Sequence, residues 1–66
     1  MRLPWLREVR EERLLTQEHL AELSGVSRKT IFRLESGLHG QIPTVEKIAV
    51  ALGVNVSALT GKRRRA

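Results

Sequence analysis

The sequence has no cysteine, aspartate or tyrosine, and its aromatic side chains are one tryptophan and one phenylalanine. The lack of cysteine excludes a disulfide framework and a thiolate metal site, as expected for an intracellular protein. No apolar run approaches the roughly 20 residues that span a membrane, and the first ten residues lack the apolar core of a signal peptide. We therefore expect a cytoplasmic protein that does not enter a membrane.

Catalytic and metal-binding patterns are missing as well. His19 and His39 lie twenty residues apart without the spacing of metal ligands, and no glycine-rich stretch matches a phosphate-binding loop. No nucleophile beside a base and no catalytic pair of carboxylates is evident. The sequence predicts a protein that is not an enzyme and that needs no metal or cofactor.

The charge of the chain is unevenly distributed along its 66 residues. Four of its twelve lysines and arginines lie in residues 62–65, so residues 1–61 hold eight cations against seven glutamates, a balance of +1. We expect one small domain over residues 1–61 and a basic, disordered tail over residues 62–66, which either adds nonspecific phosphate contacts or only solubilises the chain. The informative charge is local, because residues 27–34 carry three cations and no acid.

The segment TQEHLAELSGVSRKTIFRLESG, residues 16–37, predicts two short amphipathic helices separated by a tight turn. Thr16 and Ser27 are suitable N-cap residues for these helices, and Gly25 can adopt the positive φ that the turn requires. Ala21 is small where the two helices must cross. The segment therefore indicates a helix-turn-helix, the alternative being a plain helical hairpin with a solvated basic face.

The second helix of this segment has two distinct faces on a helical wheel of about 100° per residue. Ile31 and Leu34 are directed toward a core. The other face carries polar, cationic and aromatic side chains, namely Arg28, Lys29, Phe32, Arg33 and Ser36. Arginine and lysine suit the acceptor pair of guanine in the major groove and the nearby phosphates. This pattern favours a DNA-binding helix.

Another helix is expected at the start of the chain, from about Pro4 to Leu14, where apolar residues recur at helical spacing and Pro4 fits the first turn. Trp5 lies near its start. We expect this ring to be partly buried against the core; the alternative is a role in binding a partner.

Two further helices are expected after the helix-turn-helix. The fourth is capped by Gln41 or Thr44 and stops at Gly53, and a last short helix is capped by Ser57 and ends near Gly61. The chain has no internal repeat and no linker long enough to divide domains. The expected fold class is all-α, with five short helices and no strand.

The chain resembles the Cro and phage-repressor family of helix-turn-helix domains, also called the XRE family. The resemblance runs from about Leu6 to Leu59 and rests on residues that match the family pattern in order and spacing: Arg10, Leu15, Thr16, Gln17, Leu20, Ala21, Gly25, Val26, Ser27, Ile31, Leu34, Glu35, Gly37, Ala51, Leu52, Gly53 and Val54. It implies a lambda-repressor-like DNA-binding domain with the helix-turn-helix at the second and third helices.

The resemblance also implies roles for particular residues. The positions that face base edges in the family are Ser27, Arg28, Lys29 and Arg33, and Phe32 shares their face of the helix. The expected phosphate contacts are Gln17, Thr30, Ser36, His39 and Gln41. Gln17 in relatives also supports a base-reading side chain.

In relatives, Arg10 and Glu35 form an ion pair between the first helix and the recognition helix. Glu35 lies at the edge of the packed face, where an unpaired charge would be costly and a bidentate partner would satisfy it. The alternative is that both side chains are solvated.

Two features depart from the family pattern. The loop of residues 37–41 has no lysine or arginine, so its phosphate contacts would come from backbone N–H groups, Gln41 or a protonated His39. Phe32 is an apolar ring on the DNA-facing arc. It either contacts a thymine methyl group or folds onto neighbouring aliphatic stems, and the sequence leaves both open.

These observations predict a sequence-specific DNA-binding transcriptional regulator of prokaryotic or phage origin. One small module contacts only a few base pairs, so we expect a homodimer on a palindromic operator with half-sites about 34 Å apart. Relatives dimerise through the region after the fourth helix, where the candidate contacts are Val54, Val56, Ala58 and Leu59; the alternative for Val56 and Leu59 is that the monomer core uses them. The alternative is an antitoxin or another protein-interaction module that binds a partner such as a toxin, through Trp5 and the acidic side of the first helix.

Overall fold

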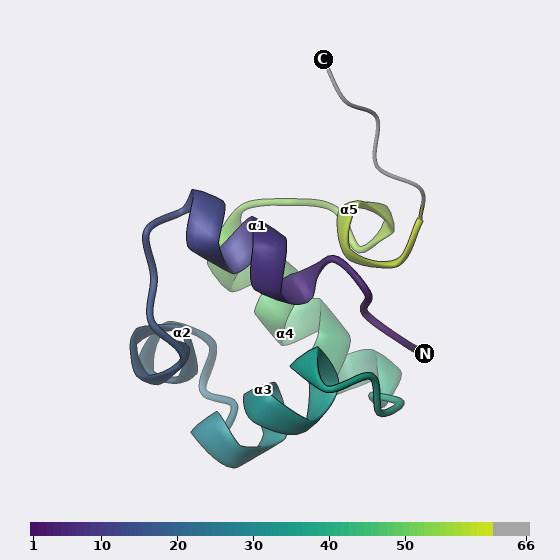
Figure 1. Cartoon of the computed structure of the whole chain (residues 1–66), viewed down its shortest axis with the longest axis horizontal. Helices are drawn as coiled ribbons and strands as arrows, with labels where there is room; N and C mark the ends of the chain where they lie inside the picture. Colours follow the sequence, from purple (N-terminus) through teal and green to yellow (C-terminus); the bar gives the residue numbers. More distant parts are fainter. Residues whose placement is uncertain (62–66) are drawn as a thin grey trace.

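The computed structural model describes residues 1–61, which form five helices and no strand (Figure 1). The helices are α1 (Leu6–Glu12), α2 (Gln17–Ser24), α3 (Arg28–Glu35), α4 (Ile42–Leu52) and α5 (Ser57–Thr60). This part of the chain agrees with the expected all-α fold. The predicted basic tail, residues 62–66, lies outside the described residues. No helix within residues 1–61 has the length and apolar character needed to cross a membrane.

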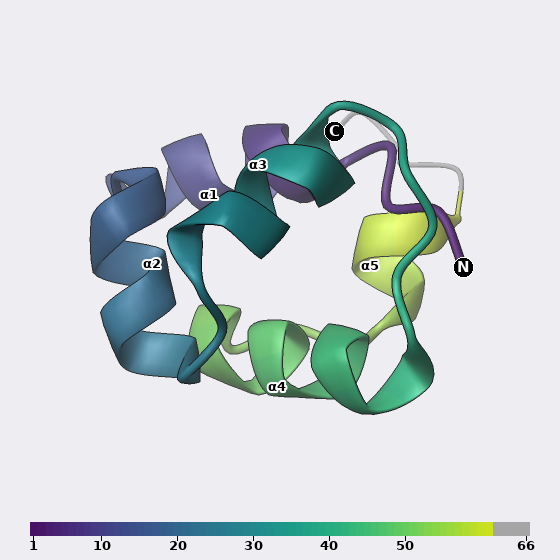
Figure 2. The same ribbon diagram turned by 90° about the horizontal axis from the view of Figure 1, so that it is seen from below.

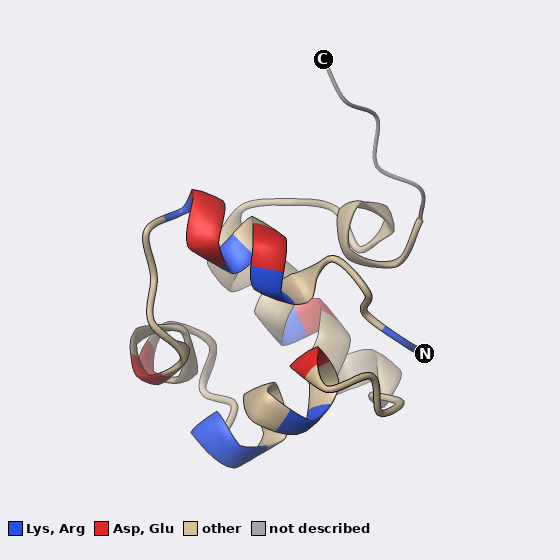
Figure 3. Cartoon of the chain, in the orientation of Figure 1, with Lys and Arg blue, Asp and Glu red and all other residues tan. Residues whose placement is uncertain are grey.

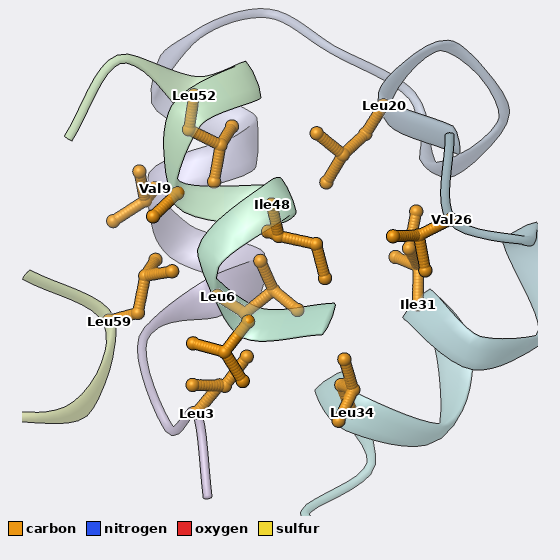
Figure 4. Close-up of a cluster of buried hydrophobic side chains, with 12 residues drawn as sticks. Leu3, Leu6, Val9, Leu20, Val26, Ile31, Leu34, Ile48, Leu52 and Leu59 are labelled. Atoms are coloured by element: carbon orange, nitrogen blue, oxygen red, sulfur yellow. The ribbon is translucent and has the colours of Figure 1, made fainter. Parts of the chain in front are cut away.

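The hydrophobic core is built from all five helices and the segment before α1. Figure 4 shows most of its side chains converging between α4 and the helices around it. The buried members are Leu3, Leu6, Val9, Leu20, Val26, Ile31, Leu34, Val45, Ile48, Ala49, Leu52 and Leu59. From the side of α3 and α4, Figure 2 shows α2 and α5 at opposite ends of α4. Helix α3 contributes Ile31 and Leu34 to this core from one face.

The predicted caps of the helix-turn-helix are confirmed. The Thr16 hydroxyl accepts from the His19 N–H at 3.0 Å, and the Ser27 hydroxyl accepts from the Thr30 N–H at 3.2 Å. Gly25 ends α2 in the left-handed conformation, with φ of 74°. These local interactions fix where both helices start and how the chain turns between them.

The first helix is shorter than predicted. It spans Leu6–Glu12, with Trp5 at the N-cap position and Arg13 at the C-cap. Leu14 has a left-handed φ of 59°, and the next N–H, that of Leu15, donates to the carbonyl of Arg10 at 3.2 Å. The helix cannot continue through a residue in this conformation, so the expected end at Leu14 is wrong.

Helix α4 has Gln41 at its N-cap position, without a side-chain capping bond, and ends at Gly53, which has φ of 71°. The prediction that Ser57 caps α5 is wrong, because Val56 occupies the N-cap position and Ser57 is already helical. This single turn is bonded to the start of α1, because the backbone N–H of Trp5 donates to the Leu59 carbonyl at 3.2 Å.

Trp5 is partly buried against the core, as predicted, and its indole N–H donates to the carbonyl of Gly61. The residues expected at a dimer contact are also engaged within the monomer. Leu59 is fully buried, and Val54 and Val56 pack against the core. Leu59 therefore belongs to the monomer core, whereas Val54 and Val56 pack against it and stay partly exposed.

Candidate nucleic-acid interface

Helix α3 is buried on one face and open to solvent on the other. Ile31 and Leu34 are 0% and 2% exposed. The opposite face carries the residues expected to contact DNA, all exposed: Arg28, Lys29, Phe32, Arg33 and Ser36. Figure 3 shows basic residues along α3, whereas the acidic residues lie mainly on α1 and α2. The exposed face of α3 is therefore a compact cationic surface on a rigid helix.

Ser27 and Thr30, which we expected to contact a base and a phosphate respectively, bond to each other. Besides capping the helix, the Ser27 hydroxyl lies 2.9 Å from the Thr30 hydroxyl, with Ser27 as the donor. Ser27 is exposed and Thr30 is partly buried. The pair fixes the N-terminal turn of α3, which presents the cations at positions 28 and 29.

A buried ion pair connects α3 to α1. Arg10 Nε lies 2.6 Å from Glu35 Oε2, and Arg10 Nη2 lies 3.2 Å from Glu35 Oε1. The two side chains are 10% and 6% exposed. A third nitrogen, Nη1, donates to the Leu15 carbonyl at 2.6 Å. This fork geometry satisfies both charges where water is largely excluded.

The hydrogen bond with Glu35 is the main cause that raises the pKa of Arg10 above its ordinary value, against the opposing effect of burial. The guanidinium therefore stays charged at all pH values at which the protein would function. Its charge is directed to Glu35 and is not free for an anion.

Gln17 also bonds to Glu35, which the sequence did not indicate. Its side-chain Nε2 donates to Glu35 Oε1 at 3.0 Å, so one carboxylate joins α1, α2 and α3. Gln17 is the first residue of α2, where backbone N–H groups lack an acceptor within the helix. The bond to Glu35 uses one of the two N–H groups of Nε2, and the backbone N–H points out of the helix start.

An open hollow of about 450 Å³ lies between α1, the start of α2 and α3. Its lining residues are Arg7, Arg10, Gln17, Arg28, Phe32 and Glu35. A neighbouring hollow is lined by Gln17, Arg28, Lys29 and Phe32. The ring of Phe32 is 59% exposed and is not part of the core. Cations and this apolar ring therefore share one concave surface.

The loop after α3 is joined to the start of the chain. The Met1 ammonium lies 3.1 Å from His39 Nδ1, and Arg2 Nε lies 3.1 Å from His39 Nε2. The Gly40 N–H donates to the Met1 carbonyl at 2.7 Å. Arg2 thus brings a permanent cation to a loop that has none of its own. The pairing joins residues 37 apart, a separation that no local sequence pattern reveals.

The other residues expected to contact phosphates, Ser36, His39 and Gln41, are exposed but make different hydrogen bonds. Both ring nitrogens of His39 lie within 3.1 Å of nitrogens from the start of the chain, and since a neutral imidazole accepts at only one nitrogen, only one of the two contacts is a hydrogen bond to the ring. Ser36 Oγ donates to the Phe32 carbonyl at 2.9 Å, and Gln41 makes no side-chain capping bond. Within residues 1–61, no group of three histidine or acidic side chains is arranged to hold a metal ion.

A family model described as Helix-turn-helix, HTH_3, matches residues 6–59 of the chain. The chain is 38% identical over 58 residues to the immunity repressor protein of Bacillus phage phi105, covering 86% of this chain and 40% of that protein. It is 45% identical over 60 residues to the HTH-type transcriptional repressor RghR of Bacillus subtilis, covering 86% of this chain and 44% of that protein. The chain therefore spans less than half the length of these two relatives.

Two solved structures have the same fold. The restriction-modification controller protein C.AhdI of Aeromonas hydrophila matches with a TM-score of 0.78 and 36% identity, over 82% of this chain and 83% of that one. An HTH_3 family transcriptional regulator of Vibrio cholerae matches with a TM-score of 0.77 and 34% identity, over 82% of this chain and 31% of that one. These matches confirm the fold and the family resemblance inferred from the sequence.

Proposed function

Since the chain belongs to the helix-turn-helix family, we propose that it is a sequence-specific DNA-binding transcriptional regulator. In this proposal α3 enters the major groove and α2 lies across the DNA backbone. The observation that carries it is the division of α3 into a fully packed inner face and an outer face with three exposed cations. A scaffold helix needs no such surface, whereas a helix that reads DNA does.

Base contacts are assigned to the outer face of α3. Arg28, Lys29 and Arg33 have the donors and the reach to bind guanine edges, and Ser27 and Phe32 lie beside them. The buried pair of Arg10 and Glu35 holds this face at a fixed angle to the rest of the domain. Rigid placement supports sequence reading, because base contacts require a defined register on the duplex.

Phosphate contacts are assigned to the two ends of this surface. At one end lie the backbone N–H of Gln17 and the hydroxyl of Thr30. At the other lie Ser36, His39 and Gln41, to which the structure adds the nearby Arg2. One cation beside this loop supports a moderate, salt-dependent contribution to affinity.

A single module of this size reads few base pairs, so we propose that it binds a palindromic operator as a homodimer. Of the candidate dimer contacts, Leu59 is buried in the monomer, and Val54 and Val56 are partly exposed beside it. The relatives named as repressors favour regulation by repression. A regulator of this kind acts in the cytoplasm of a prokaryotic cell.

The alternative of an antitoxin or another protein-binding module has less support. Its expected aromatic anchor, Trp5, packs against the core and bonds to Gly61. The acidic residues of α1 remain as a surface for a partner, but nothing in the described residues favours a toxin over other proteins.

The proposal is tested by selecting bound sites from a random DNA pool at about 0.15 M salt, where weak screened attraction is reduced. We expect an inverted repeat with half-sites about one helical turn apart. Recovery of no preferred sequence would contradict a sequence-specific regulator and would favour a protein partner.

A further inference from the structure

Phe32 is the exposed large apolar side chain of α3, and packing does not explain it. Its ring is 59% exposed, and it is absent from the core cluster that Ile31 and Leu34 join from the same helix. An apolar ring at such a position gains little from folding. Within the proposed DNA-reading face, the ring fits a ligand that has an apolar group beside anionic or acceptor groups.

The surroundings of the ring are polar, and Gln17 among them is held in place. Gln17, Arg28 and Lys29 line the same hollow as Phe32. Gln17 is fixed by its bond to Glu35, and Ser36 Oγ donates to the carbonyl of Phe32 itself. The ring therefore extends from a rigid helix, with cations beside it and an amide across the hollow.

The major groove offers one apolar group among its acceptors and donors, the methyl group on C5 of a pyrimidine. Thymine carries it, and so does 5-methylcytosine. We propose that Phe32 contacts a pyrimidine C5-methyl group and so makes that methyl part of the recognised sequence. This inference rests on the proposed function, and it takes the base contact from the two possibilities that the sequence leaves open.

The contacted methyl group should lie close to the base that Arg28 binds. Arg28 and Phe32 are four residues apart on one face of α3, about 6 Å along the helix axis.

The test replaces each thymine of the selected operator, one at a time, with deoxyuridine, which lacks the methyl group alone. At one thymine per bound module, we expect wild-type affinity to fall about fourfold, because a buried methyl group contributes about 0.8 kcal/mol. Phe32→Ala should bind the two duplexes equally, and Phe32→Leu, which keeps an apolar group, should retain part of the difference. Neither variant removes a core residue, and thermal melting checks that both fold.

A second arm compares cytosine with 5-methylcytosine at each cytosine of the operator. A gain from methylation that disappears in Phe32→Ala would identify 5-methylcytosine as the source of the methyl group. An operator whose binding responds to no C5-methyl group in a Phe32-dependent way would overturn the inference while leaving the regulator intact. Equal loss of affinity for all DNA in Phe32→Ala would overturn it too. Selection of no operator at all would instead remove the proposed function on which the inference rests.

Discussion

Breaking the ion pair between Arg10 and Glu35 should destabilise the domain severely. Both side chains are at least nine-tenths buried, so removing one partner leaves the other charge without compensation. Such a loss costs about 3 to 5 kcal/mol. A domain of this length has a total stability on the order of 3 to 10 kcal/mol, from about 0.05 to 0.15 kcal/mol per residue. Arg10→Met or Glu35→Gln alone is therefore expected to remove a large part of the stability of the domain.

Urea denaturation followed by circular dichroism measures these effects, with the double variant Arg10→Met/Glu35→Gln completing the cycle. The double variant should be clearly more stable than the sum of the single losses predicts, because no charge is left buried and the new amide can still accept from Gln17. Arg7 and Glu11 provide the matched control, since this pair on α1 is 72% and 56% exposed at 3.3 Å. Its coupling should stay below about 1 kcal/mol. Equal coupling energies for the two pairs would refute the reasoning.

The contribution of this ion pair to the free energy of unfolding should not change with pH near neutrality. A raised pKa means that the contribution of Arg10 is complete below the ordinary pKa of arginine and is lost only as pH rises through the still higher value in the folded state. Between about pH 7 and about pH 9, the difference in unfolding free energy between wild type and Arg10→Met should therefore stay constant. A steady decline over that range would contradict the assignment.

Three further predictions concern single residues. Leu14→Gly should stabilise the domain by about 1 kcal/mol in urea denaturation, because glycine relieves the left-handed strain of an exposed leucine, whereas Leu23→Gly within α2 should destabilise it by a similar amount. Arg33→Ala should weaken operator binding by about 1 to 3 kcal/mol and relax base preference at one position in a repeated site selection; equal losses on operator and random DNA would argue against base reading. Arg2→Ala should weaken binding to all DNA sequences alike and reduce the slope of log affinity against log salt concentration by about one. An unchanged slope would show that Arg2 does not contact a phosphate.

The helix-turn-helix was predictable because its boundaries depend on neighbouring residues. Thr16, Gly25 and Ser27 act within one turn of where they stand, so residue type alone indicates their roles. The inward and outward faces of α3 follow from the helical period in the same way. Residue types were less informative at Leu14, since leucine favours helix and its left-handed conformation is set by the closing bond from Leu15 to Arg10.

Parts of the candidate site depend on contacts between distant segments. The family resemblance implied a pairing of Arg10 with Glu35, but the third member, Gln17, lies 18 residues from Glu35 and shows no period that links them. The approach of Arg2 to His39 likewise depends on how the first residues cross to the loop after α3. Of the candidate dimer contacts, Leu59 is buried and Val54 and Val56 are partly buried against the core, because a short chain needs much of its apolar surface for its own packing.

Nuclear magnetic resonance can show whether the outer face of α3 contacts DNA, by following backbone amide signals while the selected operator is added, with a scrambled duplex as the control. We expect operator-specific shifts to concentrate in residues 27–36, the first turn of α2 and the loop of residues 37–41. Shifts centred on the acidic side of α1, or identical shifts with both duplexes, would contradict DNA reading by α3.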